Sequence, residues 1–343
     1  MHNYQEIFTF QHLYQAYKMC LKGKRHKQEA IDFSLALSPS LWSLYYELVY
    51  HTYQVSGYHE FKIFDPKERM IQAISFRDRV VQHCIVDNYL IPLFTKRFIY
   101  DNVACQIDKG TSLAHKRIRV FLCQYFKKHG KKGYVVKLDI HKYFESIDHD
   151  VLKALLTKMV PDQQALRLLF VIIDSYNFQS NKGLPMGNQT SQYFALLYLN
   201  SLDHFIKEKL QVKYYLRYMD DMLLLVNSKQ KASECYRQIK EVIESKKLSL
   251  NPKSRYFPLK DGFEMIGWRF RLLDTGKIIA TLRRSSKKRI KGRVKAEILK
   301  ASNFQQIHQM KVAYKGFLQY GNAYSFYQRL WIKMSKIDYA FYL

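Results

Sequence analysis

Tyr218-Met219-Asp220-Asp221 places two adjacent carboxylates between two short apolar runs, residues 214–216 (YYL) and 222–226 (MLLLV). Apolar residues on both sides of a polar centre are typical of a β-hairpin whose turn carries the acids. Two acids held on a rigid turn can bind Mg²⁺ against phosphate oxygens. The alternative is an ordinary turn in which the short Asp side chains bond to local backbone.

The chain carries a large excess of positive charge. Its 56 Lys and Arg residues outnumber its 29 Asp and Glu residues, which gives a net charge of +27. Such charge repels itself across a folded surface unless a polyanion neutralises it, and nucleic acid is the polyanion we expect. Aromatic residues make up 15% of the chain and supply rings that can stack on bases. A generally solvated basic surface and an anionic membrane are the alternatives.

Length and composition indicate a globular protein with two or three structural units, since 343 residues are 48% hydrophobic. The five cysteines are scattered without a CxxC pair, so we expect neither a disulfide framework nor a zinc site, and a reducing cytoplasm fits. No apolar run approaches the length of a membrane span, and residues 1–6 have no apolar signal core. We therefore expect no membrane partner.

Helices alternate with antiparallel hairpins along the chain, which predicts an α+β fold and not a doubly wound sheet. The predicted helices cover residues 1–56, 68–93 with an end near Pro92, 111–126, 149–173 with a break at Pro161, 191–210 and 230–247. The predicted strands cover residues 61–64, 134–139, the two arms of the acidic hairpin, and two strands within residues 263–281 that turn at Asp274-Thr275-Gly276. A basic helix follows, and then an aromatic-rich segment. Its rings are expected to pack as core, namely Tyr314, Phe317, Tyr320, Tyr324, Phe326, Tyr327 and Trp331.

Asp139 lies at the end of the predicted buried strand 134–139. If this acid converges with Asp220 and Asp221, three carboxylates can share two Mg²⁺ ions about 3.5–4 Å apart. Such a centre suits nucleotidyl transfer, in which the protein mainly positions groups and neutralises charge. An N-cap or turn role is the alternative for Asp139, because Ile140-His141-Lys142 follows it.

Several segments of the chain carry a family resemblance. Residues 136–149 (VKLDIHKYFESIDH) resemble the first catalytic motif of reverse transcriptases, and residues 218–221 (YMDD) match the second. Residues 183–192 (GLPMGNQTSQ) fall between them in the right order. Residues 263–268 (FEMIGW) resemble the primer-grip segment, and residues 66–71 (PKERMI) and 76–82 (FRDRVVQ) resemble the fingers motif of bacterial enzymes. The resemblance runs from about residue 60 to residue 270.

The resemblance implies a right-hand polymerase fold with fingers, palm and thumb and an antiparallel palm sheet. Residues 1–130 would form an N-terminal helical region and the fingers, residues 131–282 the palm with a finger-linked segment near 150–190, and residues 283–343 the thumb. It also implies an RNA-directed DNA polymerase that copies a structured template RNA into cDNA from dNTPs. Two Mg²⁺ ions, with Mn²⁺ as a substitute, would be its cofactors.

By the same resemblance, Asp139, Asp220 and Asp221 are the catalytic acids at the metal centre, and the carbonyl of Ile140 completes one metal's shell. Adjacent residues on extended backbone point to opposite faces, so Asp221 is expected to act more indirectly.

The resemblance also implies a set of nucleotide-binding residues, namely Arg69, Lys62, Phe144, Met186, Gly187, Gln192 and Lys253. An Arg fork at position 69 matches triphosphate oxygens, and an aromatic ring at position 144 would clash with a 2′-hydroxyl. Met186 and Gly187 would lie near the templating base pair, and Gln192 would help to shape the pocket around that pair. The alternatives are solvated charges for Arg69 and Lys253, core packing for Phe144 and a locally bonded amide for Gln192.

Residues 283–295 (RRSSKKRIKGRVK) form the densest basic run. Ile290, Val294 and Ile298 fall at helical spacing and leave the cations on the other face. A thumb helix along the backbone of an RNA–cDNA hybrid needs this design, because phosphate contacts give affinity without reading sequence. A solvated helix is the alternative. The expected nucleic-acid-binding cations are Arg283, Arg284, Lys287, Lys288, Lys291, Arg293 and Lys295.

Ser191-Gln192 stands where most reverse transcriptases have Ser-Pro, and the surrounding pattern resembles the enzymes of diversity-generating retroelements. Gly110-Thr111 and residues 198–205 (YLNSLDHF) are similar to that group, although Met186 replaces its usual aliphatic residue. This resemblance implies copying that is error-prone at template adenines and a small basic helical accessory protein as a partner. A retron or group II intron-like enzyme and a phage-defence polymerase of the same fold are the alternatives.

Overall fold

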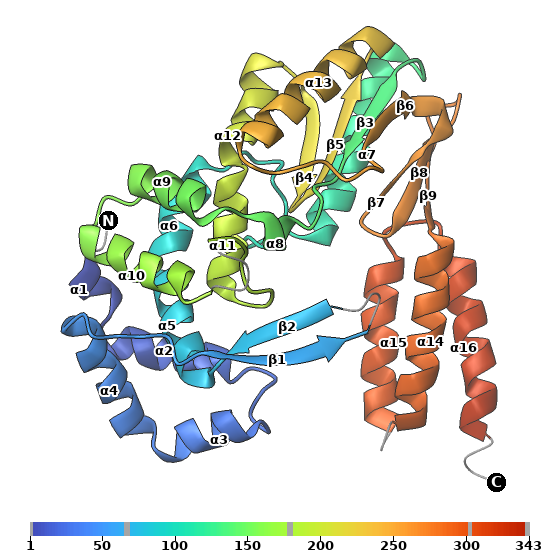
Figure 1. The fold of residues 1–343 in the computed structure, drawn as a ribbon. Helices are drawn as coiled ribbons and strands as arrows, with labels where there is room; N and C mark the ends of the chain where they lie inside the picture. The colour runs from blue at the N-terminus through green and yellow to red at the C-terminus, as the bar shows by residue number, and fades with distance from the viewer. Residues whose placement is uncertain (1–2, 65–68, 177–180, 301–303, 340–343) are drawn as a thin grey trace. The chain divides into compact units, whose positions relative to one another are not determined.

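The acidic segment forms the predicted hairpin within a four-stranded antiparallel sheet (Figure 1). β4 (Tyr214–Tyr218) and β5 (Asp221–Val226) pair with Tyr218 opposite Asp221, so Met219 and Asp220 form the loop. β3 (Tyr134–Leu138) pairs with β5 on one side and with β6 (Arg255–Pro258) on the other. Because every pairing in this sheet is antiparallel, the predicted sheet type is confirmed.

Both faces of this sheet are covered. Every residue of β5 after Asp221 is buried, which explains why the hairpin arm is a continuous apolar run and not an alternating pattern. Helix α7 (Thr111–His129) packs against β4, where the rings of Phe121 and Tyr125 lie 5.7 and 5.6 Å from the ring of Tyr214. The hairpin is therefore anchored on a packed support.

The computed structural model describes residues 3–64, 69–176, 181–300 and 304–339. The chain divides into two compact units, each built from three segments. The first unit contains Met1–Ile107, Asp139–Gln211 and Gln238–Pro252, and the second contains Asp108–Leu138, Val212–Arg237 and Lys253–Leu343. The boundaries proposed above for fingers, palm and thumb stay predictions.

The second unit also holds a three-stranded sheet and the C-terminal helices. The strands are β7 (Phe263–Met265), β8 (Trp268–Leu272) and β9 (Ile278–Leu282). The sequence predicted two strands here; the first splits because Ile266 and Gly267 both take positive φ, 45° and 84°. The turn predicted at Asp274-Thr275-Gly276 is confirmed, since Gly276 N donates to Leu273 O at 3.0 Å.

The basic run forms helix α14 (Arg284–Lys300), followed by α15 (Phe304–Leu318) and α16 (Tyr324–Tyr339). Ile290, Val294 and Ile298 are buried, so the predicted apolar stripe is confirmed. Trp331 is buried as expected, but Tyr324 is 71% exposed and its assignment to the core is wrong.

The first unit begins with helices that confirm the N-terminal prediction as far as Val49. They are α1 (Tyr4–Ile7), α2 (Phe10–Cys20), α3 (Gln28–Leu35) and α4 (Leu37–Val49). The later helices of the chain are α8 (Tyr143–Ser146), α9 (His149–Met159), α10 (Gln163–Asp174), α11 (Gln189–Tyr198), α12 (Asn200–His204), a π-helical turn (Phe205–Lys209) and α13 (Lys229–Ser245). The break predicted at Pro161 separates α9 from α10 and is confirmed.

The helix predicted over residues 68–93 is wrong at its start, whereas its predicted end near residue 93 agrees with the last α-helical residue, Phe94. Its first part is strand β2 (Arg69–Ile74), which pairs antiparallel with β1 (Tyr58–Ile63). Helix α5 (Phe76–Ile85) starts only after Ser75, whose hydroxyl caps it by accepting from Asp78 N at 3.2 Å. The helical path then continues through a π-helical turn (Val86–Leu90) into α6 (Ile91–Phe94) and a 3₁₀ turn (Thr95–Arg97), so Pro92 sits in a first turn, where its missing N–H is tolerated. Within the described ranges, no helix combines the length and apolar character needed to cross a bilayer.

His115 is a buried histidine packed among aromatic rings of the second unit. Its ring lies 5.2–5.4 Å from the rings of Trp268, Phe270 and Tyr320, and neither ring nitrogen has a hydrogen-bond partner among the described residues. Burial, aided by Arg119, lowers the pKa of His115 from 6.5 to about 4. Between these two pH values, the unfolded chain therefore binds a proton at His115 that the folded chain does not bind.

We predict that stability is full above pH 6.5 and falls by on the order of 3 kcal/mol as the pH drops toward 4. Thermal melts of the protein and of His115→Phe across this range test the prediction. The variant should lose most of the dependence, and an unchanged slope would show that His115 is not its source.

Candidate functional site

A buried arginine, Arg217, supports the acidic turn. Met219 takes a left-handed φ of 56°, which is uncommon for a residue with a side chain. Arg217 is fully buried, and its Nη1 donates to the carbonyl of Met219 at 3.1 Å. This bond holds the turn that presents Asp220 and Asp221. Sequence reasoning missed Arg217, although a lone Arg inside the apolar run 214–226 was a usable signal.

Asp221 is paired with a lysine from the neighbouring strand. The ammonium of Lys137 on β3 forms an ion pair with the Asp221 carboxylate, and the two side chains are 19% and 28% exposed. Lys137 lies opposite Leu223 in the register, so Asp221, two residues earlier on β5, is its diagonal neighbour on the same face. Sequence reasoning gave Lys137 no role.

Asp139 directly follows β3, whose last residue, Leu138, lies opposite Met222. The pairing thus brings the residue before Asp139 beside the residue after Asp221. The carbonyl of Asp139 accepts from Asn251 N at 2.8 Å, and Ile140 forms a bridge with Leu250. Asp139 and Ile140 belong to the first unit and the acidic turn to the second, so the gathering of the three acids stays a prediction.

The donor set suits a divalent cation. Within the described segments, no three His, Cys, Asp or Glu side chains lie together in a way that could hold a metal ion. The acids of the hairpin are nevertheless hard oxygen ligands of the kind that Mg²⁺ prefers, and one of them already attracts the positive charge of Lys137. A cation that brings its own waters and a substrate phosphate needs few protein ligands.

Phe144 and its neighbour Tyr143 have different surroundings. Tyr143 is buried and its hydroxyl donates to Ala195 O at 2.5 Å, whereas Phe144 is half-buried. The two ring centroids are 5.8 Å apart. Tyr143 therefore supplies the core packing at this point, and Phe144 stays only half-buried.

A polar pocket of about 300 Å³ lies in the first unit. It is lined by Lys24, Ile74, Arg79, Gln82, His83, Gly187, Asn188, Gln189 and Gln192. The predicted Gly187 and Gln192 are thus brought together, whereas the half-buried Met186 is outside this lining.

The pocket combines cations with amides. Burial and the charge of Arg79 lower the pKa of Lys24. The buried Gln82 accepts from Thr190 Oγ1 at 2.8 Å, while its Nε2 and the Nδ2 of buried Asn188 have no hydrogen-bond partner within the described part of the chain. Paired cations and open amide donors suit a nucleotide, which offers both phosphate and base acceptors. Sequence reasoning missed Gln82 and Asn188.

The other predicted nucleotide contacts are placed only in part. Lys62 is exposed on β1, opposite Met70, and Lys253 is exposed just after Asn251. The side chain of Arg69 and residues Pro66, Lys67 and Glu68 of the fingers-like motif lie outside the described residues. Their assignments stay predictions.

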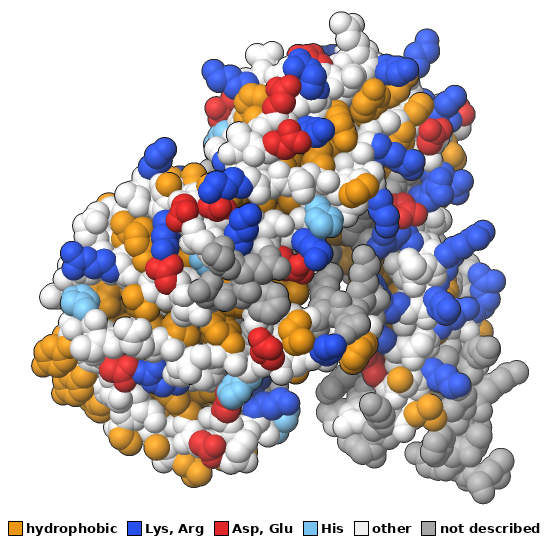
Figure 2. Space-filling model, in the orientation of Figure 1, with side chains coloured by type: hydrophobic (Ala, Val, Ile, Leu, Met, Phe, Trp, Pro, Cys, Tyr) orange, Lys and Arg blue, Asp and Glu red, His pale blue; other side chains and the backbone are white. Residues whose placement is uncertain are grey.

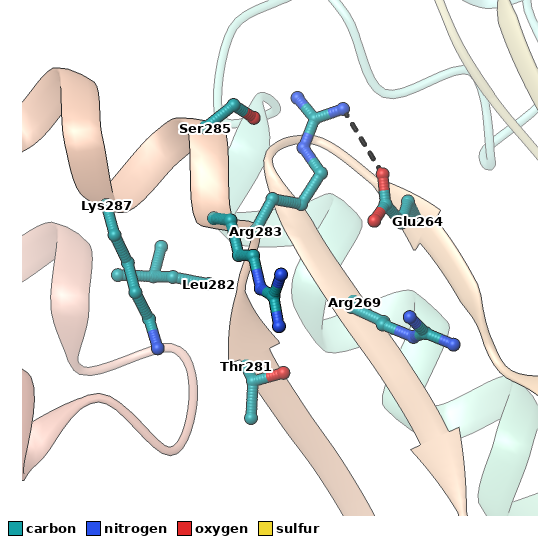
Figure 3. A pocket seen from close by; sticks show the side chains of 8 residues that line it. Glu264, Arg269, Thr281, Leu282, Arg283, Ser285 and Lys287 are labelled. Carbon is teal, nitrogen blue, oxygen red and sulfur yellow. Dashed lines mark ion pairs between the residues drawn. The ribbon is translucent and has the colours of Figure 1, made fainter.

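A cationic hollow of about 600 Å³ lies where β9 runs into α14 (Figure 3). Its lining residues are Glu264, Arg269, Thr281, Leu282, Arg283, Arg284, Ser285 and Lys287. Glu264 pairs with Arg283 at 3.6 Å, which leaves a clear excess of positive charge in the hollow. The hollow joins the primer-grip-like segment to the basic run, two features that sequence reasoning treated separately.

The basic run is accessible along α14. Arg284, Lys288, Lys291, Arg293 and Lys295 are exposed, and Arg283 and Lys287 are half-buried. Lys287 and Lys291 lie 6.0 and 5.9 Å from the ring of Phe326. Figure 2 shows Lys and Arg side chains gathered over the C-terminal sheet and the adjoining ends of the C-terminal helices. The helix therefore has the accessible cationic face that was expected.

Comparison with known proteins identifies a family and relatives. The family described as "Reverse transcriptase (RNA-dependent DNA polymerase)" matches residues 64–270. Protein YkfC of Escherichia coli (strain K12) is 22% identical over 252 residues, which cover 61% of this chain and 65% of YkfC. An uncharacterized 91 kDa protein in the cob intron of Schizosaccharomyces pombe is 27% identical over 159 residues, which cover 44% of this chain and 17% of that protein. The chain thus spans less than two thirds of each of these relatives.

One solved structure has a fold similar to that of this chain. The structure of apo telomerase from Candida tropicalis aligns with a TM-score of 0.52 at 12% identity, covering 71% of this chain and 52% of that chain. At this identity the likeness concerns the fold alone. The predicted right-hand polymerase fold, with helices and an antiparallel sheet, is confirmed.

We predict that Arg269→Gln weakens binding of an RNA–DNA hybrid by about 3- to 10-fold and lowers the slope of log affinity against log salt by roughly 0.9, the value of one phosphate contact. Fluorescence anisotropy titrations at several salt concentrations measure both. Arg271→Gln is the matched control, because Arg271 is exposed on the same face of β8 but lies outside the hollow. Equal losses in the two variants would contradict a specific role for the hollow.

Proposed function

Because the chain belongs to the reverse transcriptase family, we propose that it is an RNA-directed DNA polymerase that copies a template RNA into cDNA. The observation that carries this proposal is the acidic hairpin turn, held by Arg217 beside the strand that leads into Asp139. Reverse transcriptases generally use divalent metal ions. A cytoplasmic location is proposed from the scattered, free cysteines.

Asp139 and Asp220 would hold two Mg²⁺ ions, with Mn²⁺ as a substitute, and Asp221 and the carbonyl of Ile140 would support them. Bound there, the ions would lower the pKa of the primer 3′-hydroxyl and neutralise charge on the leaving pyrophosphate. The protein's own groups position the reactants. Arg217 holds the turn in its left-handed conformation and so fixes where the acids stand.

The remaining predicted residues would each contact a different part of the substrate. Arg69, helped by Lys62 and Lys253, would bind the triphosphate of the incoming dNTP. Phe144 would exclude a 2′-hydroxyl, a role that its half-buried ring permits. Gly187 and Gln192, with Met186 nearby, would shape the space for the templating nucleotide.

The cations of the hollow and of α14 would bind the RNA–cDNA hybrid through its phosphates. Such contacts set position and affinity, while base pairing with the template supplies the sequence of the product.

We predict that Asp220→Asn and Asp139→Asn each lower primer extension on an RNA template by more than about 100-fold, because a neutral amide cannot replace a metal-binding carboxylate. Single-turnover extension measures the loss. Asp274→Asn is the control, since it removes the same charge from an exposed acid of the second unit that pairs with Lys131. DNA synthesis that survives the loss of Asp220 would defeat the proposal.

We further propose that the enzyme belongs to a diversity-generating retroelement. The Ser191-Gln192 pair supports this assignment, together with Gly110-Thr111. The proposal includes a structured template RNA, frequent errors opposite template adenine and a small basic helical accessory protein.

An intron-type enzyme is the second candidate. The S. pombe relative, which is a protein in the cob intron, favours it. Retron-type and phage-defence enzymes of the same fold remain further alternatives from the sequence.

We predict that cDNA made on the cognate RNA carries errors concentrated at template adenines. Deep sequencing of cDNA made with and without the accessory protein measures the error spectrum, and a defined heterologous RNA is the control template. Errors spread evenly over the four template bases would favour the intron-type candidate, and product independent of the template would favour a defence-type enzyme.

A further inference from the structure

Lys137 is a half-buried cation with a fixed place beside the acidic turn. It lies on β3, which is flanked by β5 and β6, so its main chain is held from both sides. Its side chain is 19% exposed and its ammonium pairs with the Asp221 carboxylate. Arg217 fixes the backbone of the turn, and Lys137 holds one of the two side chains that the turn presents.

The surroundings direct Lys137 toward Asp221. On its other side Lys137 lies opposite Arg255 of β6, and like charges opposite each other in a sheet repel. The guanidinium of Arg255 lies 5.2 Å from the ring of Phe257 on its own strand, which gives this second cation a separate partner. A Lys side chain reaches a diagonal neighbour easily, and Asp221 is the carboxylate in that position.

This arrangement has a consequence for metal binding. A lysine ammonium is a compact single charge on a flexible stem, so it can leave a carboxylate more readily than a forked arginine can. A divalent cation brings twice the charge to the same oxygens. An ammonium and a metal ion cannot both use the full coordinating capacity of one carboxylate.

We infer that Lys137 is an internal placeholder cation, which neutralises Asp221 while the metal site is empty and yields that carboxylate when a divalent ion binds. The inference rests on the proposed function, because it takes Asp221 to be part of the metal site. Lys137 is a positioning residue in this account. It stabilises the metal-free turn and raises the metal concentration that the turn requires.

The test uses Mn²⁺ as the probe and needs no polymerisation. Binding of Mn²⁺ to the purified, chelator-treated protein is followed by electron paramagnetic resonance of the free ion, and thermal melts are recorded with and without Mn²⁺. Lys137→Met, which keeps the length of the stem and removes the charge, should bind Mn²⁺ roughly tenfold more tightly, the change that 1.36 kcal/mol produces. Its metal-free form should melt at a lower temperature than the wild type, and Mn²⁺ should remove this difference in melting temperature.

Two further variants test the charge control and the metal role of Asp221. Lys131→Met is the matched control, because it removes an equal charge from a Lys–Asp pair elsewhere in the second unit, where Lys131 and Asp274 are 3.2 Å apart, and it should leave Mn²⁺ affinity unchanged. Asp221→Asn should weaken Mn²⁺ binding. If Asp221→Asn has no effect, the proposed metal role of Asp221 fails and the inference with it.

If Asp221→Asn weakens binding but Lys137→Met leaves Mn²⁺ affinity unchanged or weaker, the inference alone is overturned. A Lys137→Met protein that folds poorly without metal should regain its melting temperature with Mn²⁺. A loss of folding that Mn²⁺ does not restore would mean that Lys137 is purely structural, which also overturns the inference.

Discussion

The register of β3 against β5 is the constraint on which the site depends. Leu138, the last residue of β3, lies opposite Met222, the second residue of β5. A slip of one residue would send every side chain of β3 to the other face, including Lys137. The buried apolar residues on both faces of the sheet prevent that slip, so the packing of the core determines where the acids of the turn stand.

In a protein with a net charge of +27, the cations around the candidate sites fall into two groups. Arg217 and Lys137 support the acidic turn from within the sheet, Lys24 and Arg79 line the polar pocket, and most cations of α14 are exposed. The first two cations have partners within the protein. The others line a pocket or a surface that a nucleic acid or a nucleotide can neutralise.

Local sequence pattern predicted the elements that depend on local rules. The acidic hairpin, the strand before Asp139, the break at Pro161 and the apolar stripe of α14 all follow from periodicity or from a proline. The strand over residues 69–74 was predicted as helix, because this short segment directly precedes a true helix. The helical pattern was extended backwards across Ser75, the residue that caps that helix. Only a partner strand, β1, distinguishes the two readings of that run.

The acids of the candidate site could be proposed from the sequence, but the residues that contact them could not. Asp139, Asp220 and Asp221 stand out because carboxylates are rare in apolar runs and because the motifs around them resemble those of a known family. The partners of those acids depend on cross-strand register, which no local pattern encodes, so Lys137 and Arg217 went unnoticed. The open amides of Gln82 and Asn188 were hidden for a similar reason, since α5 and the start of α11 are far apart in the sequence.

The proposed metal site requires that acids from two distant parts of the sequence bind the same divalent cations. The most direct measurement is a crystal structure with Mn²⁺ and a primer–template, in which the anomalous signal locates the ions. We expect anomalous peaks bonded to carboxylate oxygens of both Asp139 and Asp220. Peaks that contact neither acid, or Asp220 without Asp139, would show that the two segments do not share the ions.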